Sequence, residues 1–177
     1  MTLFDTSIGR VGIAWRDEVV IGVQIPELDD RTTLRQLAIT ATTSDQLTTA
    51  AAPPAIQTAI GAITSLLDGE AVDLDGIDVD LDAVGPFDRA VYEVTRSIPP
   101  GESLTYGEVA AGIGEPGAAQ AVGRSLGANP FPIVIPCHRV LGAGGHLTGF
   151  SAAGGIETKR KMLLIEGCPA VPPSLFD

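Results

Sequence analysis

One short stretch constrains the chain more than any other: residues 133–140 read Ile-Val-Ile-Pro-Cys-His-Arg-Val. The run of β-branched residues predicts a short buried strand, and Pro136 is expected to end it. The chain then presents a thiol, an imidazole and a guanidinium in succession, at Cys137, His138 and Arg139. The sequence therefore predicts a buried strand that delivers three polar, reactive groups at its end.

Two interpretations of Cys137 are open. It is either a buried core cysteine beside a surface His-Arg pair, or a nucleophile. A thiol is a strong nucleophile only as the thiolate, which a neighbouring His can generate and which the cation of Arg139 and helix amides favour. For an isolated Cys-His dipeptide the first interpretation is preferred, so the choice depends on the rest of the sequence.

Length and composition favour a packed globular protein of one or two small domains. The chain has 177 residues, of which 45% are hydrophobic and 19% are charged. The first residues carry no basic start or apolar secretory core, and no segment has the uninterrupted apolar length that a bilayer requires. We therefore expect a cytoplasmic protein without membrane contact.

The cysteine and histidine content argues against a disulfide scaffold and against a metal centre. Cys137 and Cys168 are the two cysteines of the chain, which also has two histidines. A single bridge between the cysteines is formally possible, but in a reducing compartment both are expected to be thiols. A tetrahedral zinc site is not expected.

The net charge of −11 argues at first against nucleic acid, since phosphate contacts need Lys and Arg. The charges are unevenly distributed: residues 1–85 contain 4 basic and 14 acidic side chains, and residues 86–177 contain 7 basic and 8 acidic ones. The acidic half is therefore expected to face away from DNA. The near-neutral half is expected to bind DNA modestly and with a strong dependence on salt.

The first half of the chain predicts a small antiparallel sheet followed by helices, from its alternating apolar residues and its helix-start signals. The predicted elements are strands at 2–6, 11–15 and 19–25, helices at 31–38 and from Pro53 to Leu67, and a loop over 40–52. Strict alternation over 72–82 predicts one more half-buried strand with a solvated acidic face. A calcium loop is disfavoured there, because the segment lacks a glycine in the register that the loop geometry requires and lacks the terminal glutamate.

The second half predicts a helix-turn-helix unit. Pro86 can begin a helix that Pro99-Pro100-Gly101 ends, and the expected domains are accordingly 1–85 and 86–177. Thr105 and Glu108 have capping-box spacing and open a short helix, and after a glycine turn a further helix is expected over about 118–128. An ordinary helical hairpin would show much the same pattern.

Projection of this last helix at about 100° per residue places Gln120, Gly123, Arg124 and Gly127 outward. Apart from one amide and one guanidinium this face is small, which permits close approach to a shallow minor groove. The small residues can equally pack against a neighbouring element, and the helix alone does not decide between the two.

Two elements follow the cysteine motif. Residues 141–150 form a glycine-rich stretch that indicates a loop bordering a pocket. Residues 157–166 predict a final helix, in which Lys159, Arg160 and Lys161 are expected to be exposed and Met162, Leu163 and Ile165 largely buried.

Several motifs, in order, resemble those of the O6-alkylguanine-DNA alkyltransferases, also called methylated-DNA–protein-cysteine methyltransferases. They are Ile98-Pro99-Pro100-Gly101, Thr105-Tyr106-Gly107, Asn129-Pro130 and the cysteine motif itself. The resemblance covers about residues 87–166. It implies an α+β fold: a small N-terminal antiparallel sheet with helices, RNase H-like, and a mainly helical C-terminal domain with a winged helix-turn-helix.

The resemblance also implies a DNA-repair protein that reacts once, without a cofactor, as a monomer on double-stranded DNA containing O6-alkylguanine. Cys137 would attack the alkyl carbon of a guanine rotated out of the duplex and keep the alkyl group as a stable thioether. His138, oriented by Glu166, would take the thiol proton through a water. The other implied roles are a hydrogen bond from Tyr106 to a guanine ring nitrogen, bracing of the turn by Asn129, and a structural role for Arg139.

The implied DNA-contacting residues are Thr105, Ala119, Gln120, Gly123 and Arg124, and the implied pocket residues are Pro136, Val140, Gly149 and Phe150. Two features depart from the family pattern. Family members typically carry an arginine at the position of Gln120, which fills the gap left by the rotated base; glutamine brings no charge, and Arg124 is the candidate substitute. The segment 150–156 is also longer than in the shorter members.

Two rival functions use the same residues. A lesion sensor or a helix-turn-helix regulator would bind DNA without chemistry, but sensors related to this family typically lack the nucleophile, so Cys137 favours transfer. A cysteine hydrolase would pair Cys137 directly with His138. Adjacent residues of an extended chain point to opposite sides, however, so a water-mediated link suits them better.

Overall fold

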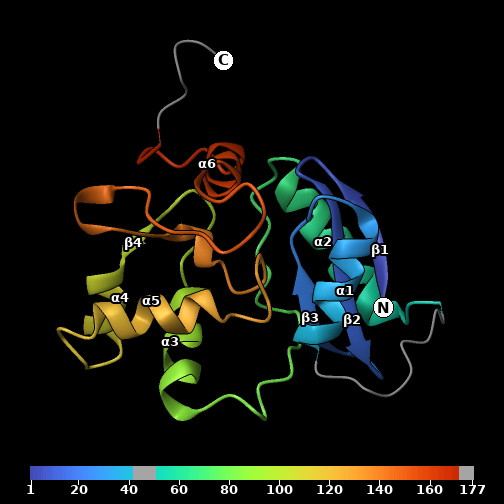
Figure 1. The fold of residues 1–177 in the computed structure, drawn as a ribbon, viewed down its shortest axis with the longest axis horizontal. Coiled ribbons are helices and arrows are strands. Elements are labelled where there is room, and N and C mark those ends of the chain that lie inside the picture. The colour runs from blue at the N-terminus through green and yellow to red at the C-terminus, as the bar shows by residue number, and fades with distance from the viewer. Residues whose placement is uncertain (42–50, 172–177) are drawn as a thin grey trace.

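The computed structural model describes residues 1–41 and 51–171 and has an α+β fold, as predicted (Figure 1). The first half contains β1 (Thr2–Thr6), β2 (Gly9–Arg16), β3 (Val19–Gln24), α1 (Asp30–Thr40) and α2 (Pro54–Leu67). The second half contains α3 (Pro86–Arg96), β4 (Leu104–Thr105), α4 (Tyr106–Gly112), α5 (Ala119–Gly127), the 3-10 helix η1 (Cys137–Arg139), β5 (Val140–Leu141), the 3-10 helix η2 (Ala143–Gly145) and α6 (Ile156–Ile165).

The three N-terminal strands form an antiparallel sheet in the order β1-β2-β3, which confirms the predicted meander. Helices cover both faces of this sheet. Ala14 and Ile21 pack with Leu37 of α1, whereas Val11 and Ile13 belong to the larger core that includes α2. At Gly12 a Cβ atom would lie 3.0 Å from a methyl carbon of Leu37, so a glycine there lets α1 lie close to β2.

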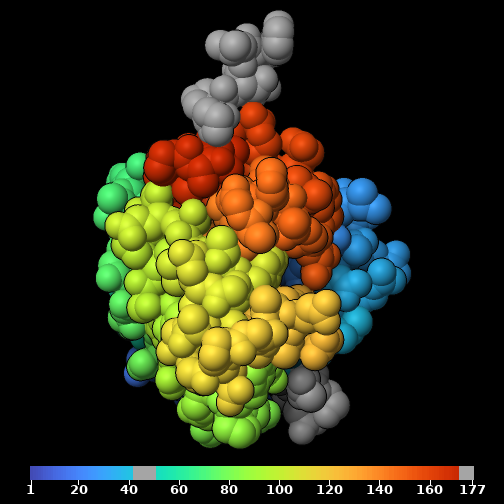
Figure 2. All heavy atoms as spheres, turned by 90° about the vertical axis from the view of Figure 1, so that its left-hand side faces the viewer, coloured from blue at the N-terminus to red at the C-terminus, as the bar shows by residue number. Residues whose placement is uncertain are grey.

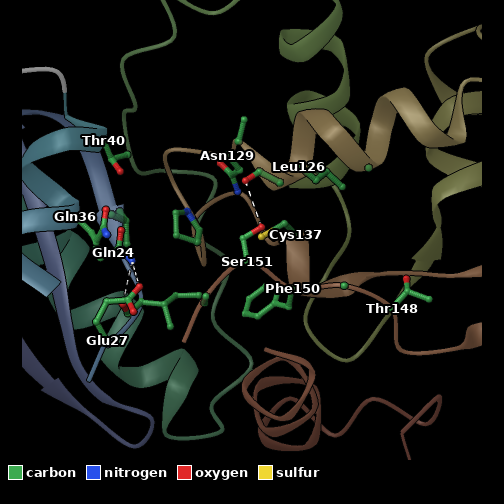
Figure 3. Close-up of a pocket in the computed structure, with 18 of the residues that line it drawn as sticks. Gln24, Glu27, Gln36, Thr40, Leu126, Asn129, Cys137, Thr148, Phe150 and Ser151 are labelled. Carbon is green, nitrogen blue, oxygen red and sulfur yellow. Dashed lines mark hydrogen bonds between the residues drawn. The ribbon is translucent and has the colours of Figure 1, made fainter. Parts of the chain in front are cut away.

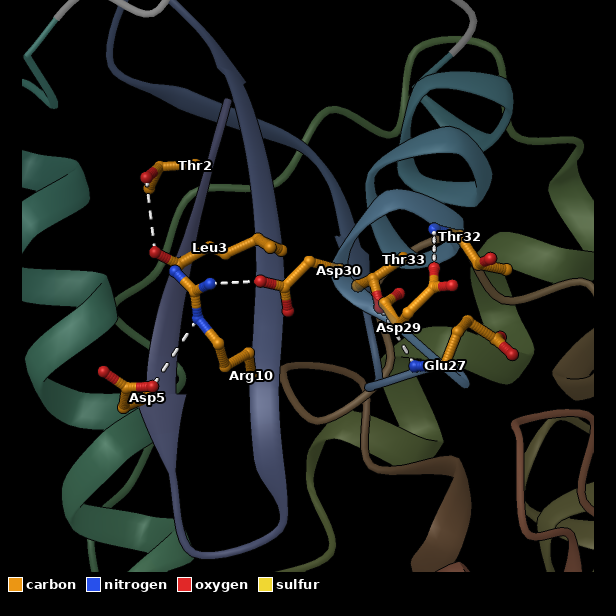
Figure 4. A network of polar contacts seen from close by, with 9 residues as sticks. All are labelled: Thr2, Leu3, Asp5, Arg10, Glu27, Asp29, Asp30, Thr32 and Thr33. Atoms are coloured by element: carbon orange, nitrogen blue, oxygen red, sulfur yellow. Dashed lines mark hydrogen bonds and ion pairs between the residues drawn. The ribbon is translucent and has the colours of Figure 1, made fainter.

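Hydrogen bonds fix the turn that connects β3 to α1 (Figure 4). The Asp29 side chain accepts from the backbone N of Thr32 at 2.7 Å and caps the helix, a contact worth about 1 kcal/mol. The backbone N of Glu27 donates to the hydroxyl of Thr33 at 3.0 Å. The turn is therefore held at both of its ends. The predicted loop over 40–52 falls largely on residues 42–50, outside the described residues.

The strand predicted over 72–82 is wrong. The segment makes an isolated parallel bridge, between Val79 and Val20 of β3, although Leu74 and Ile77 point into the core as the alternation indicates. The backbone turns instead of extending because aspartate side chains accept hydrogen bonds from amides two residues later, at Asp75 and Asp82.

The helices of the second half pack around one another, with α3, α4 and α5 in mutual contact and α6 against η1. Pro86 occupies the first turn of α3, and the capping box of Thr105 and Glu108 opens α4, both as predicted. The short parallel strands β4 and β5 pair Leu104 with Val140. This pairing ties the start of α4 to the residue that follows the Cys-His-Arg motif.

Residues 133–135 are buried, as predicted, but they do not form a strand. The chain folds back on itself there: the N of Ile135 donates to the carbonyl of Phe131 at 2.8 Å, and Ile133 has φ +77°. Asn129 causes the fold-back, because its Nδ2 donates to the carbonyl of Ile135 and its Oδ1 accepts from the N of Phe131, both at 2.9 Å. The strand of this motif, β5, follows the cysteine instead of preceding it.

The two halves of the chain are joined next to this turn. The backbone N of Val23 in β3 donates to the carbonyl of Pro130 at 2.9 Å. The N-terminal sheet therefore lies against the segment that leads to Cys137. Within the described part of the chain, no helix has the length and apolar character needed to cross a membrane.

Candidate active site

Cys137 is the first residue of η1 and lies in the wall of a cavity of about 840 Å³ (Figure 3). The residue is 9% exposed, and both it and Cys168 are free cysteines. Figure 2 shows a hollow between the end of α5 and the loop that follows β5, with the N-terminal half behind it. The volume is within the range of pockets that bind small organic molecules, so the cavity has room for a purine.

The cavity is built from both halves of the chain. Its lining residues are Val23, Gln24, Ile25, Glu27, Gln36 and Thr40 from the N-terminal half, Tyr106, Gly123, Leu126, Gly127, Ala128 and Asn129 from α4, α5 and the following turn, Pro132 and Cys137, and Thr148, Gly149, Phe150, Ser151 and Ala152 from the loop after β5. Of the predicted pocket residues, Gly149 and Phe150 line it. Pro136 and Val140 are buried and do not.

His138 and Arg139 both bind the carboxylate of Glu166, the C-cap residue of α6. Nε2 of His138 lies 2.9 Å from Oε1, while Nε and Nη2 of Arg139 donate to Oε2 and Oε1, each at 2.9 Å. All three side chains are almost completely buried. The arrangement is a bidentate Arg-carboxylate pair with an imidazole on the same carboxylate, which fixes the plane of the ring.

Burial and neighbouring charges together set the protonation states of this cluster. Burial alone would raise the pKa of Glu166, but the hydrogen bonds and charges of His138 and Arg139 outweigh it and lower the pKa to about 2. Burial lowers the pKa of His138 below its ordinary value, against the opposing effect of Glu166. The cluster at neutral pH is therefore a carboxylate, a guanidinium and a neutral imidazole.

The tautomer of His138 follows from its partner. An ionised carboxylate can only accept, so Nε2 carries the ring hydrogen and Nδ1 keeps its lone pair. Nδ1 is buried and has no hydrogen-bond partner among the described residues. A buried basic nitrogen in the residue next to Cys137 can therefore receive a proton.

The thiol of Cys137 is not activated by its surroundings alone. Burial raises its pKa, and a hydrogen bond with the Asn129 side chain and the charge of Lys159 oppose this rise only in part. The thiol therefore predominates at neutral pH, and reaction as the thiolate requires a base.

Lys159 is buried, with 0% exposure, and the prediction that it is exposed is wrong. Its Nζ donates to the carbonyls of Val140 at 2.6 Å and Thr148 at 3.3 Å, and lies 5.7 Å from the centre of the Tyr106 ring. Burial lowers its pKa from 10.5 to about 8. The sequence does not distinguish Lys159 from its neighbours Arg160 and Lys161. Lys159 points inward because α6 packs against η1.

Tyr106 begins α4 and lies on the cavity wall. Burial raises the pKa of its hydroxyl, with a smaller opposing effect from a hydrogen bond with the Thr148 side chain. The hydroxyl therefore stays protonated at neutral pH and can donate to a ligand. Thr105 is placed one residue earlier, where its hydroxyl caps α4 by accepting from the N of Glu108 at 3.2 Å.

On α5 the predicted outward face is confirmed for Gln120, Arg124 and Gly127, whereas Gly123 is half-buried. Val122 and Leu126 are buried. Ala119 is also half-buried, and at Gly123 a Cβ atom would be in ordinary contact with the Tyr106 ring, 3.8 Å away. Gly123 therefore packs against Tyr106, which lies in the cavity wall.

Sequence patterns missed the N-terminal part of the cavity, including Gln24, Glu27 and Gln36. These residues lie more than 80 positions before the cysteine motif, and only tertiary packing brings them to it. Within the described ranges, no group of three or more His, Cys, Asp or Glu side chains is arranged to hold a metal ion.

Comparison with known proteins places this geometry in context. Residues 86–168 match the family described as 6-O-methylguanine DNA methyltransferase, DNA binding domain. The methylated-DNA–protein-cysteine methyltransferase of Mycolicibacterium paratuberculosis is 47% identical over 107 residues, which are 60% of this chain and span 64% of that relative, less than two thirds of its length. The protein of the same name from Mycobacterium bovis is 46% identical over 119 residues, 66% of this chain and 71% of the relative.

The likeness extends over nearly the whole chain in three dimensions. The crystal structure of Mycobacterium tuberculosis OGT in complex with DNA superposes with a TM-score of 0.74 and 33% identity, covering 99% of this chain and 98% of that one.

Proposed function

Because this chain belongs to the methylated-DNA–protein-cysteine methyltransferase family, we propose that it repairs DNA by moving an alkyl group from guanine O6 to the sulfur of Cys137. The sulfur forms a bond to the alkyl carbon as the carbon–O6 bond breaks, and the electron pair of that bond leaves with the guanine. The thiol proton ends on the restored guanine. A thioether resists hydrolysis, so each molecule reacts once, and no cofactor takes part.

The buried cluster supports this chemistry. Nδ1 of His138 is the basic atom that accepts the Cys137 proton, through an intervening water, and Glu166 stabilises the imidazolium that results. Arg139 holds Glu166 in place and does not touch the substrate. Tyr106 donates a hydrogen bond to a ring nitrogen of guanine as negative charge develops on the leaving base.

The remaining roles belong to recognition. We assign the helix-turn-helix to α4 and α5, with the loop after β5 as its wing, and the domain boundary to the residues just before Pro86. Thr105, Ala119, Gln120, Gly123 and Arg124 face the DNA, Asn129 braces the turn that carries Cys137, and Gly149 and Phe150 close the pocket on the rotated base. In this proposal the protein acts in the cytoplasm as a monomer, and its N-terminal sheet and helices have an RNase H-like arrangement.

The observation that carries the proposal is a free thiol in the wall of a cavity that admits a purine, next to a neutral histidine whose second nitrogen is held by a carboxylate. The test is the intact mass of the protein after incubation with duplex DNA containing O6-methylguanine. We expect a gain of one CH₂ per molecule, located on Cys137 by peptide mapping, with no further product after the protein is consumed.

The same measurement separates the rival functions. Unmodified protein that still binds the lesion would indicate a sensor, and product in excess of protein would indicate a hydrolase. The presence of Cys137 in the cavity wall favours transfer over a sensor. A hydrolase is disfavoured because neither ring nitrogen of His138 makes a hydrogen bond with Cys137 among the described residues.

A further inference from the structure

The cavity extends well beyond the surroundings of the thiol. In Figure 3 Cys137 lies between Thr148 on one side and Gln24, Glu27, Gln36 and Thr40 on the other. Tyr106 belongs to the Thr148 side, because the two side chains share a hydrogen bond. The cavity therefore has a Tyr106 end and an N-terminal end, with the sulfur between them.

The N-terminal end is polar and carries one charge. Gln24, Gln36 and Thr40 present amide and hydroxyl groups there, and Glu27 is the only charged residue among the described residues that line the cavity. The chemistry of this end thus favours ligands that donate hydrogen bonds, above all cations, and disfavours anions.

Glu27 is held in position. Its backbone N donates to the Thr33 hydroxyl at 3.0 Å, and its Oε1 accepts from Nε2 of Gln24 at 3.0 Å (Figures 3 and 4). An ionised carboxylate accepts several hydrogen bonds, and Gln24 occupies one site on one oxygen. The carboxylate is therefore fixed in direction and has capacity for a further donor.

The geometry of alkyl transfer directs a substituent towards this end. In a direct displacement the sulfur, the attacked carbon and O6 lie in line, so the rest of the alkyl group extends sideways from that axis. The guanine fills the Tyr106 end in the proposed function. The remaining space for a longer group is at the other end, where Gln24 and Glu27 line the cavity.

We propose that the N-terminal end of the cavity is a subsite for extended O6-alkyl groups, and that Glu27, held by Gln24, makes it selective for groups ending in a cation or a hydrogen-bond donor over groups ending in a carboxylate. The inference rests on the proposed function, because it concerns the substituent that Cys137 accepts. The transfer itself is unchanged: the S–C bond forms, the C–O6 bond breaks, and guanine is released.

The test uses the full chain and duplex oligonucleotides with one O6-substituted guanine: methyl, and aminoalkyl, hydroxyalkyl and carboxyalkyl chains of matched, increasing length. Single-turnover rates are divided by the methyl rate of the same protein, which removes any general effect of a variant. Glu27→Gln removes the charge and keeps the shape. Glu18→Gln, on the exposed β2–β3 turn, removes the same charge away from the cavity and is the matched control.

We expect the wild type to prefer aminoalkyl over carboxyalkyl groups by about two- to fivefold once the chain is long enough to reach Glu27, the range of a partly exposed ion pair. This ratio should fall towards one in Glu27→Gln and keep its wild-type value in Glu18→Gln. It should be larger at low salt in the two proteins that retain Glu27, the wild type and Glu18→Gln. DNA attracts an amine in every variant, so the decisive quantity is the difference in this rate ratio between the wild type and Glu27→Gln.

An equal ratio in the wild type and in Glu27→Gln overturns the subsite, as does failure to transfer any group longer than methyl. Failure of methyl transfer as well overturns the proposed function instead, so the two results are distinguishable.

Discussion

Nε2 of His138 lies 2.9 Å from Oε1 of Glu166, although 28 residues separate them in the chain. The contact links the end of α6 to the residue beside the candidate nucleophile. It determines which nitrogen of His138 carries the hydrogen, and Arg139 binds the same carboxylate on two atoms. The basicity of His138 therefore depends on the C-terminus of α6, the helix that also carries Lys159.

We expect Glu166→Gln to slow alkyl transfer by roughly tenfold to a hundredfold, because an amide can leave His138 in the wrong tautomer and cannot stabilise its cation. Arg139 would also lose its buried counter-charge, which costs on the order of 3 kcal/mol of unfolding free energy. Single-turnover rates and urea unfolding measure the two effects. Glu157→Gln, in the exposed first turn of α6, is the control, and a rate equal to wild type in Glu166→Gln would refute the role.

Acidification should destabilise the fold in two steps. The pKa of His138 in the folded protein is below its ordinary 6.5, so folding favours the neutral imidazole. The stability that this provides is complete above pH 6.5 and is lost as the pH falls below that value. The pKa of Glu166 falls from 4.5 to about 2 on folding. The stability that the ionised carboxylate provides, on the order of 3 kcal/mol, is therefore lost as the pH falls between these two values. Thermal unfolding against pH measures both windows. His138→Gln should remove the upper window and narrow the lower one, because His138 contributes to the lowered pKa of Glu166.

Cys137→Ser is expected to abolish transfer while DNA binding is retained, since the hydroxyl is a far weaker nucleophile and the side chain keeps its size. Cys168→Ser is the control: Cys168 is buried in a separate cluster with Leu141 and Leu163, so the change should lower stability but leave the adduct on Cys137. Mass spectrometry and a DNA-binding titration give the two readings. Equal loss of binding in Cys137→Ser would contradict the site assignment.

The sequence predicts those parts of the fold that depend on local signals. The strands of the sheet, the capping box at Thr105 and Glu108, and the outward face of α5 all follow from spacing alone. The strand expected before Pro136 fails because the Asn129 side chain supplies hydrogen bonds that fold the β-branched residues back. Residues 72–82 fail for a similar reason, since aspartates bond to nearby amides.

The candidate site divides in the same way. The cysteine motif indicates Cys137 and His138, and the family resemblance indicates Glu166. No periodicity indicates that Lys159 points inward or that Glu27 faces the same cavity as the thiol. Both depend on how α6 and the N-terminal sheet pack against the cysteine turn. Such contacts join residues far apart in the chain, and a single sequence carries no local sign of them.

Lys159→Met tests the buried cation. The change removes donors from the carbonyls of Val140 and Thr148, which costs about 1–3 kcal/mol and loosens the loop that carries Phe150, while it also relieves the desolvation of the buried charge. We expect a slower transfer. Since the folded pKa is about 8 against 10.5 unfolded, burying the charge costs stability below pH 8, and wild-type stability should rise as the pH increases from 8 to 10.5. Lys159→Met should lose this rise, whereas Lys161→Met, on the exposed side of α6, should keep it.

Gln120→Arg is expected to tighten binding to duplex DNA. Gln120 is exposed near the start of α5, on the face that also presents Arg124, so a guanidinium there adds a cation where the proposed interface meets the phosphates or the gap left by a rotated base. One added phosphate contact should steepen the dependence of log affinity on log salt by about one unit. Fluorescence anisotropy at several salt concentrations measures both quantities.

Gln57→Arg, on the exposed face of α2, adds the same charge outside the proposed interface and should change neither the affinity nor its salt dependence beyond a small general effect. If Gln120→Arg binds no more tightly than Gln57→Arg, Gln120 has no part in holding the opened duplex.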